Sequence, residues 1–404
     1  MKNFKFIIIS ILAMFFVACQ DDIVTWNKNL TDTSTPDGPP EITKIILAGD
    51  TAANPTEITS ANMGDVIIIY GKNLCQISSI TFNGLEVNYR DWYAAKEFVS
   101  VPIPRSLLEE SQVTNKVVIT TSKGTVSHDL QVAAPRLLIN GLYNEFAAPG
   151  ETVQVLGDNF DLYAVGKNAA GENDFLNGDV SLDGDPIEII SVTRNIITLK
   201  IPENTADGAV FEVSSEVYRS HGGTEPAKFA FRELGTLMMT EYDNWGSDDF
   251  SGDGTKAGDP APLYGISWYV RVAGTFPGDG WYWIFGGGAN ITDADVAANP
   301  QNYDLKFEFL TAAGKPFGVG NLEFTIAQGE RNSWAAGAGG AMALETGGNW
   351  KTMTFDFQSF FDTSKVHTGA TAYNEFAIAY QVAAPEEINV DFCIANARIV
   401  KKMN

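Results

Sequence analysis

A segment that occurs twice limits the folds open to this chain. The first copy, Gly64–Leu74, reads GDVIIIYGKNL, and the second copy, Gly150–Phe160, reads GETVQVLGDNF. Beyond each copy, a short turn separates two strand-like runs, at Asn83–Gly84 in one unit and at Asp183–Gly184 in the other. These residue pairs favour two-residue hairpins. Neither unit shows helical periodicity, so each is predicted to be a small β-sandwich of short strands.

The order of these motifs resembles the IPT/TIG domain, which has an immunoglobulin-like fold. Its pattern of G-D-x-V-x-I-x-G-x-N-L, then V-x-F-N-G, then V-x-V-P covers residues 41–134 and, less closely, residues 135–232. The second unit departs from the pattern at residues 163–177, which are rich in glycine, asparagine and aspartate. We expect a longer surface loop there.

Composition changes near residue 233, where a third region begins. Six of the eight tryptophans lie in residues 233–404. Strands separated by glycine-rich loops are predicted at Thr236–Tyr242, Tyr264–Val272, Trp281–Phe285, Asp304–Leu310, Leu322–Ala327, Lys351–Asp356, Glu375–Tyr380 and Asn389–Val400. The predicted fold is therefore all-β: two immunoglobulin-like (IPT/TIG) sandwiches followed by a C-terminal jelly-roll-like β-sandwich.

The N-terminus has the pattern of an export signal. Lys2 and Lys5 precede the apolar stretch Phe6–Ala18, which is too short to span a bilayer comfortably. Residues 1–18 are therefore predicted to be a signal peptide. Its last residues, together with Cys19, resemble a bacterial lipobox, which would leave Cys19 acylated; ordinary cleavage, with Cys19 lost or free, is the alternative. The polar residues 19–40 would form a tether.

Charge and rare residues argue against several classes of function. A net charge of −23 argues against a nucleic-acid partner and against adhesion to an anionic membrane surface. The three histidines are widely scattered, so no zinc site and no cofactor are predicted. Acidic residues in Ser247–Thr255 could hold calcium, but they fit no defined calcium loop and are interpreted as a solvated loop, so no metal is predicted. Cys75 and Cys393 are predicted to be buried thiols without a disulfide.

Aromatic side chains of the third region are the candidate ligand contacts, because flat rings match the apolar faces of sugars. Trp281, Tyr282 and Trp283 follow one another on a predicted strand, where successive side chains alternate, so they cannot all enter one core. Which face would meet a ligand stays open. Loop residues complete the candidate glycan-binding set, which is Trp245, Trp281, Tyr282, Trp283, Trp334, Glu330 and Arg331. Packing inside the protein is the alternative for Trp245 and Trp334, and it is the prediction for Trp92, Trp268 and Trp350. A surface salt bridge is the alternative for Glu330 and Arg331.

The whole arrangement resembles the surface glycan-binding lipoproteins of Bacteroidetes polysaccharide-utilisation loci, in particular the kind whose C-terminal domain binds xyloglucan. The resemblance implies a non-catalytic protein, anchored by lipid in the outer membrane at the cell surface. It would capture xyloglucan or another β-glucan or hemicellulose, and its partners would be an outer-membrane glycan transporter and surface glycosidases. A secreted glycoside hydrolase and a protein-binding surface adhesin are the alternatives. The sequence contains no G-x-S-x-G, H-E-x-x-H or P-loop motif.

Overall fold

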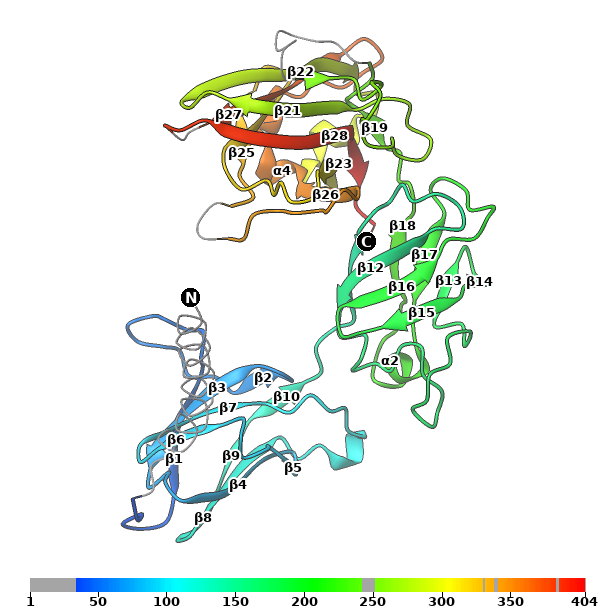
Figure 1. Cartoon of the computed structure of the whole chain (residues 1–404). Helices are drawn as coiled ribbons and strands as arrows, with labels where there is room; N and C mark the ends of the chain where they lie inside the picture. Colours follow the sequence, from blue (N-terminus) through cyan, green and yellow to red (C-terminus); the bar gives the residue numbers. More distant parts are fainter. Residues whose placement is uncertain (1–33, 242–250, 330, 338–340, 383–384, 404) are drawn as a thin grey trace, which may run out of the picture. The chain divides into compact units, whose positions relative to one another are not determined.

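The structure of the protein is a computed structural model of the 404-residue chain. It describes residues 34–241, 251–329, 331–337, 341–382 and 385–403. Strands in these ranges form three successive sandwiches of mostly antiparallel sheets (Figure 1), so the predicted all-β fold class is confirmed. The chain forms two compact units, which divide between Arg136 and Leu137. No helix within the described ranges has the length and apolar character that crossing a membrane requires.

The first sandwich packs two four-stranded sheets. The first sheet has the order β1 (Glu41–Leu47), β3 (Val66–Lys72), β7 (Phe98–Pro102), β6 (Tyr93–Ala95). The second has the order β5 (Leu85–Glu86), β4 (Ile77–Phe82), β8 (Lys116–Thr121), β9 (Gly124–Asp129). A short parallel pair, β2 (Ser60–Asn62) with β10 (Gln131–Ala133), and a 3₁₀ turn, η1 (Glu110–Gln112), complete it. Between the sheets lies a core of alternate strand residues, against which Trp92 packs as predicted.

The second sandwich, which is part of the second compact unit, repeats this plan. One sheet has the order β11 (Leu138–Leu142), β12 (Thr152–Asp158), β16 (Ile196–Lys200), β15 (Ile189–Val192). The other has the order β14 (Asp185–Pro186), β13 (Val180–Leu182), β17 (Val210–Val213), β18 (Ala227–Ala230), and α2 (Glu216–Ser220) follows β17.

The G-x-N element of the sequence repeat has the same physical cause in both sandwiches. A Cβ atom on Gly71 would lie 1.8 Å from the carbonyl oxygen of Glu41, and one on Gly157 would lie 2.1 Å from that of Leu138. The first strand of each sandwich therefore passes too close for any side chain at the glycine. Two residues later the chain turns through positive φ, at 60° for Asn73 and 71° for the equivalent asparagine, a region that asparagine tolerates well.

The third sandwich is formed by two sheets whose strands alternate along the chain, as in a jelly roll. The larger sheet has the order β20 (Ser251–Gly252), β21 (Val270–Phe276), β28 (Ile388–Lys401), β23 (Tyr303–Thr311), β26 (Lys351–Asp356), and β19 (Thr236–Leu237) also pairs with β28. The smaller sheet has the order β22 (Gly280–Asn290), β27 (Tyr373–Val382), β24 (Asn321–Ile326), β25 (Asn332–Trp334). Short helical turns connect the strands: α3 (Asp295–Ala298), η2 (Pro300–Asn302), α4 (Phe357–Phe360) and η4 (Thr363–Lys365).

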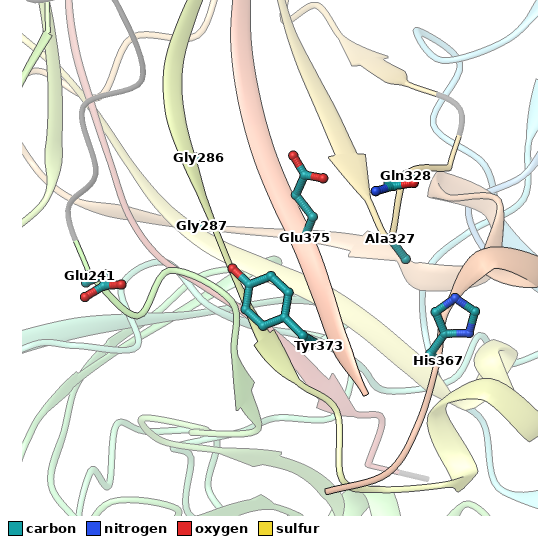
Figure 2. Close-up of a pocket in the computed structure, with 8 residues that line it drawn as sticks. All are labelled: Glu241, Gly286, Gly287, Ala327, Gln328, His367, Tyr373 and Glu375. Atoms are coloured by element: carbon teal, nitrogen blue, oxygen red, sulfur yellow. The ribbon is translucent and has the colours of Figure 1, made fainter. Parts of the chain in front are cut away.

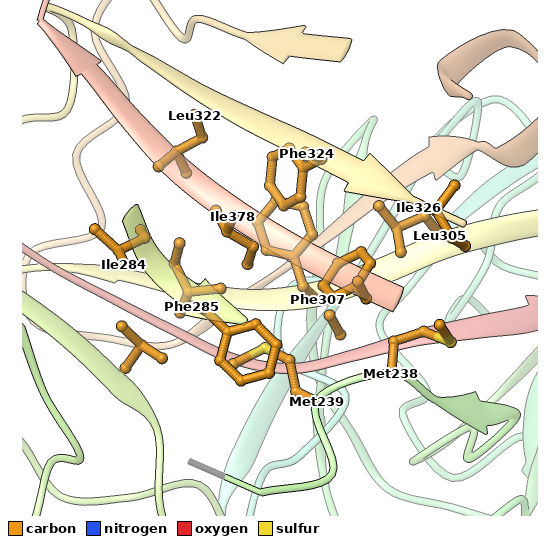
Figure 3. Close-up of a cluster of buried hydrophobic side chains, with 14 of the residues drawn as sticks. Met238, Met239, Ile284, Phe285, Leu305, Phe307, Leu322, Phe324, Ile326 and Ile378 are labelled. Carbon is orange, nitrogen blue, oxygen red and sulfur yellow. The ribbon is translucent and has the colours of Figure 1, made fainter. Parts of the chain in front are cut away.

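The core of the third sandwich is rich in aromatic side chains that fill the space between the two sheets (Figure 3). Phe307 of the larger sheet packs on Phe324 of the smaller, with ring centroids 5.2 Å apart. Trp268 stacks on Phe285, and Trp350 is buried, so both tryptophans pack inside as predicted. The larger sheet also buries Cys393, and both described cysteines are free thiols, as expected.

A buried ionic network joins the second and third sandwiches within one compact unit. The guanidinium of Arg398 donates to both carboxylate oxygens of Glu308, at 3.0 and 2.9 Å, and to Glu145 of the second sandwich, at 2.7 Å. The ammonium of Lys306 donates to Glu145 and Glu233, each at 2.7 Å. Three carboxylates thus share two cations. Burial and the nearby Glu145 carboxylate raise the pKa of Glu308 to about 7.

Candidate functional site

The alternation of β22 divides the three consecutive aromatic residues between two environments. Tyr282 packs against the core, with its ring 4.9 Å from that of Phe276 in an edge-to-face contact, and its hydroxyl donates to the carbonyl of Pro277 at 3.3 Å. Trp281 and Trp283 share the opposite face, outside the sandwich, and both are half-buried. The outer face of the sheet β22-β27-β24-β25 therefore carries two indoles.

The indoles of Trp281 and Trp283, which we call the tryptophan corner, are held in a fixed arrangement. Their ring centroids lie 4.3 Å apart and their planes meet at 75°. The indole N–H of Trp281 donates to the carboxylate of Glu323 at 2.9 Å, across two strand pairings. The Arg331 guanidinium lies over the Trp281 ring, 4.3 Å from its centroid, and 5.4 Å from that of Trp283. Contacts of this kind hold the rings before any ligand arrives, which lowers the ordering cost of binding.

Polar side chains on the outer face surround this corner. Gln381 and Asn321 lie in register with Trp281, and the amide of Asn321 donates to that of Gln381 at 3.4 Å. Arg331 lies 3.9 Å from Glu323, and its side chain is 51% exposed, so part of its N–H fork is open to solvent. Apolar rings bordered by amides, a carboxylate and a guanidinium match the alternation of C–H faces and hydroxyl edges on a sugar.

Directly beyond Trp283, the outer face has small residues before Glu375 and Tyr373 are reached. Ala377 and Ala379 of β27 lie in register with Gly286 and Trp283, respectively. Beyond these small residues lies a cavity of about 510 Å³, which the tryptophans do not line (Figure 2). The cavity is lined by Glu241, Gly286, Gly287, Ala327, Gln328, His367, Tyr373 and Glu375.

The other predicted contacts lie elsewhere or outside the described residues. Trp334, in β25, pairs with the buried Leu322, and its ring lies 5.3 Å from Phe309 and is stacked 5.4 Å from Phe317. This position corresponds to the packing alternative for Trp334, so we remove it from the candidate glycan-binding set. We also remove Tyr282, because it packs against the same core. Trp245 and Glu330 lie outside the described residues, as does Cys19.

Sequence reasoning missed the residues that the neighbouring strands bring to this face. Glu323 is separated from Trp281 by 42 positions, and Tyr373 and Glu375 by about twice as many. The alternation of Asn321–Ile326 could have indicated that Glu323 faces outward. Nothing in the sequence states which strands pair, so the two halves of the site could not be connected.

Metal binding has no support in the described residues, which contain no group of three histidine, cysteine or acidic side chains placed to hold an ion. Residues 247–250 of the acidic loop Ser247–Thr255, which include Asp248 and Asp249, lie outside the described residues. Its described part includes Asp253, whose carboxylate accepts hydrogen bonds from the backbone and hydroxyl of Thr255.

Comparison with known proteins gives a family for the third sandwich. The model of the "Surface glycan-binding protein B xyloglucan binding domain" matches residues 233–401. The match confirms the resemblance to surface glycan-binding proteins that the order of motifs and aromatic residues indicated. No curated protein matches the chain.

Three solved structures are similar over most of the chain. The surface glycan-binding protein PbSGBP-B from Prevotella bryantii is 19% identical, with 91% of this chain and 99% of that chain covered and a TM-score of 0.45. SGBP-B from a complex xyloglucan utilisation locus in Bacteroides uniformis is 14% identical, with coverage of 90% and 99% and a TM-score of 0.41. The Bacteroides ovatus mixed-linkage glucan locus SGBP-B, solved with a mixed-linkage heptasaccharide, is 13% identical, with coverage of 86% and 73% and a TM-score of 0.31.

Proposed function

We propose that this chain, whose third sandwich is a domain of the surface glycan-binding protein B type, is a non-catalytic protein that captures a neutral plant β-glucan. Xyloglucan is the first ligand to test, because the matching family is described as a xyloglucan-binding domain. The glycan would lie on the outer face of the sheet β22-β27-β24-β25, against Trp281 and Trp283.

One observation carries this proposal: two indoles stand at 75° to each other on the outer face of a domain in this family. Inside the core such rings would need no further partner. Outside it, aromatic surface held by a carboxylate and an arginine is suited to stacking against sugar rings, while Glu323, Arg331 and Gln381 offer hydrogen bonds to hydroxyls.

The size of the effect follows from area. A tryptophan buries about 150–250 Å², so a sugar that covers half of one indole removes about 100 Å² from water, worth about 2.5 kcal/mol. Association itself costs about 4 kcal/mol or more. One ring is therefore insufficient, and two rings with several hydrogen bonds give measurable affinity only for an oligosaccharide.

Calorimetric titration of the protein with xyloglucan tests the proposal. Trp283→Ala should weaken binding by about 10- to 100-fold, as the lost area implies. Tyr89→Ala is the matched control, because Tyr89 is an exposed aromatic residue of the first sandwich with Arg90 over its ring. The control should bind like the wild type. A Trp283→Ala variant that folds and binds equally well would refute the proposed surface.

Absence of catalysis is the second part of the proposal, and it separates the protein from a glycoside hydrolase. Glycosidases require a pair of carboxylic groups at the scissile bond, and Glu241 and Glu375 both line the cavity. We expect no reducing ends after prolonged incubation with xyloglucan, mixed-linkage glucan or mannan. If the wild type releases reducing ends and Glu375→Gln does not, the protein is a glycoside hydrolase instead.

The location of the protein completes the proposal. Residues 1–18 and Cys19 have the lipoprotein pattern, so we infer attachment to the outer membrane at the cell surface, where a glycan transporter and glycosidases would receive the captured chain. Mass spectrometry of the purified N-terminus tests this directly. Cys19 carrying acyl chains is the expected result, and an unmodified N-terminus downstream of Cys19 would contradict it.

A further inference from the structure

The cavity at the other end of the outer face has a composition that suits a ligand. Figure 2 shows Tyr373 and Glu375 on β27, with Glu241 on one side and Gln328 and His367 on the other. The cavity volume of about 510 Å³ is in the range of small-molecule sites. Its walls combine one large aromatic ring with several polar groups.

Most of these polar groups are not used by the fold. Within the described part of the chain, no residue hydrogen-bonds or forms an ion pair with the side chains of Glu241, Gln328, His367 or Glu375. Glu323 at the tryptophan corner differs, since it accepts a hydrogen bond from Trp281. Two carboxylates, an amide and an imidazole that converge on one cavity offer hydrogen bonds to a ligand rich in hydroxyls.

The backbone that carries these groups is held firmly. Asn374 is fully buried and its side chain makes three hydrogen bonds: it accepts from the N–H of His367 at 2.9 Å and donates to the carbonyls of His367 and Ala372 at 2.8 and 2.9 Å. A Cβ atom on Gly288 would lie 2.9 Å from the ring of Tyr373, so glycine lets that ring approach β22 closely. The side of the cavity that His367 and Tyr373 form is therefore pre-organised.

The cavity and the tryptophan corner lie on one sheet face. Glu375 pairs with Gly288 and Ala379 pairs with Trp283, with side chains of the same parity along β27. Along β27, Glu375 is four residues from Ala379, which pairs with Trp283. At about 3.3 Å per residue this gives about 13 Å, a distance that linked pyranose rings span. Between the two ends, the paired residues Gly286 and Ala377 carry no bulky side chain, and both are buried.

We propose that this cavity is a second contact region for the same glycan, which takes an uncharged sugar unit of a chain or branch that reaches from Trp283 to Tyr373. The inference rests on the proposed function and extends it to ligand length and charge. Carboxylates accept hydrogen bonds from paired sugar hydroxyls, and they repel uronic acids. The site would therefore select long, neutral glycans over short or acidic ones.

A series of xyloglucan oligosaccharides of increasing length, titrated into the full-length protein, tests the inference. Glu375→Gln exchanges a charge-assisted hydrogen bond for a neutral one, and it should weaken the longest oligosaccharide about tenfold. The affinity of this variant for the shortest oligosaccharide that the wild type binds should not change. Glu188→Gln is the matched control, an exposed glutamate at a cavity of the second sandwich, and it should bind as the wild type.

An oligosaccharide that bears glucuronic acid gives an independent measurement. The wild type should bind it more weakly than its neutral counterpart, and Glu375→Gln should reduce that preference. If Glu375→Gln loses the same affinity for short and long oligosaccharides, or loses affinity for none of them, the inference is overturned. If Trp283→Ala weakens binding and Glu375→Gln does not, only the second region fails; if Trp283→Ala has no effect, the proposed function itself fails.

Discussion

Replacement of Arg398 by methionine should destabilise the second compact unit more than any other change in its ionic network. Arg398 is 1% exposed and Glu308 is 0% exposed. Without the guanidinium, Glu308 keeps only the hydroxyl of Thr352, at 3.3 Å, and the amide of Asn396, at 3.2 Å. Glu145 keeps Lys306. The variant thus leaves one buried carboxylate without a cation.

The expected loss is about 3–5 kcal/mol, the usual cost of removing one partner from a buried pair. For a unit of this size, 1 kcal/mol corresponds to roughly 2–4 °C in the unfolding midpoint, so a decrease of about 10 °C is expected. Denaturant unfolding followed by tryptophan fluorescence measures it, because Trp268 and Trp350 report on the third sandwich.

A double variant supplies the control. Arg398→Met with Glu308→Met removes both charges and refills the space, and apolar replacement of a buried pair is often close to neutral. The double variant should therefore recover most of the stability that the single variant loses. A loss below about 1 kcal/mol in the single variant, or a double variant less stable than the single, would refute the assignment of this network as the connection between the two sandwiches.

Three further predictions follow from single contacts. The pKa of Glu308 is about 7 in the folded protein and 4.5 is its ordinary value, so between these pH values the folded state holds a proton that the unfolded chain releases. The free energy of unfolding should therefore fall by up to about 3 kcal/mol as pH rises from 4.5 to 7. Glu308→Gln should remove this pH dependence, which melting curves at several pH values measure. Gly157→Ala places a methyl group against the Leu138 carbonyl, so the second sandwich should show a lower melting temperature, whereas Gly184→Ala, with no atom within 4 Å, should cost only the strain of its positive φ. Trp334→Ala should cost about 3–5 kcal/mol of unfolding free energy through loss of core packing, and a folded variant that loses xyloglucan affinity without losing stability would contradict its assignment to the core.

Local sequence signals predicted the strands well because strand alternation and turn residues act over a few positions. Asn83 and Gly84 both have positive φ, as do Asp183 and Gly184, so the two predicted hairpin turns are confirmed. All eight strands predicted in the third region have a counterpart. Two predicted strands were too long: the one from Thr236 ends at Leu237 as β19, and the one from Tyr264 begins only at Val270 as β21. The short strands β20 and β25 were missed because two or three residues show no periodicity.

The sequence predicted less about the site because its residues come together only through pairing. Trp334 appeared as a loop residue beside Arg331, yet it pairs with Leu322 and so points into the core. The division of Trp281 and Trp283 from Tyr282 was predictable, but not which set faces outward. That depends on β27 and β24, and on a bulge between Trp283 and Phe285 that shifts the register.

A crystal structure with a bound xyloglucan oligosaccharide tests the central claim most directly. Sugar rings are expected against the indoles of Trp281 and Trp283, with hydroxyls within hydrogen-bonding distance of Glu323 or Arg331. An oligosaccharide on the outer face of the larger sheet, around β21 and β23, or on either of the first two sandwiches, would contradict the account.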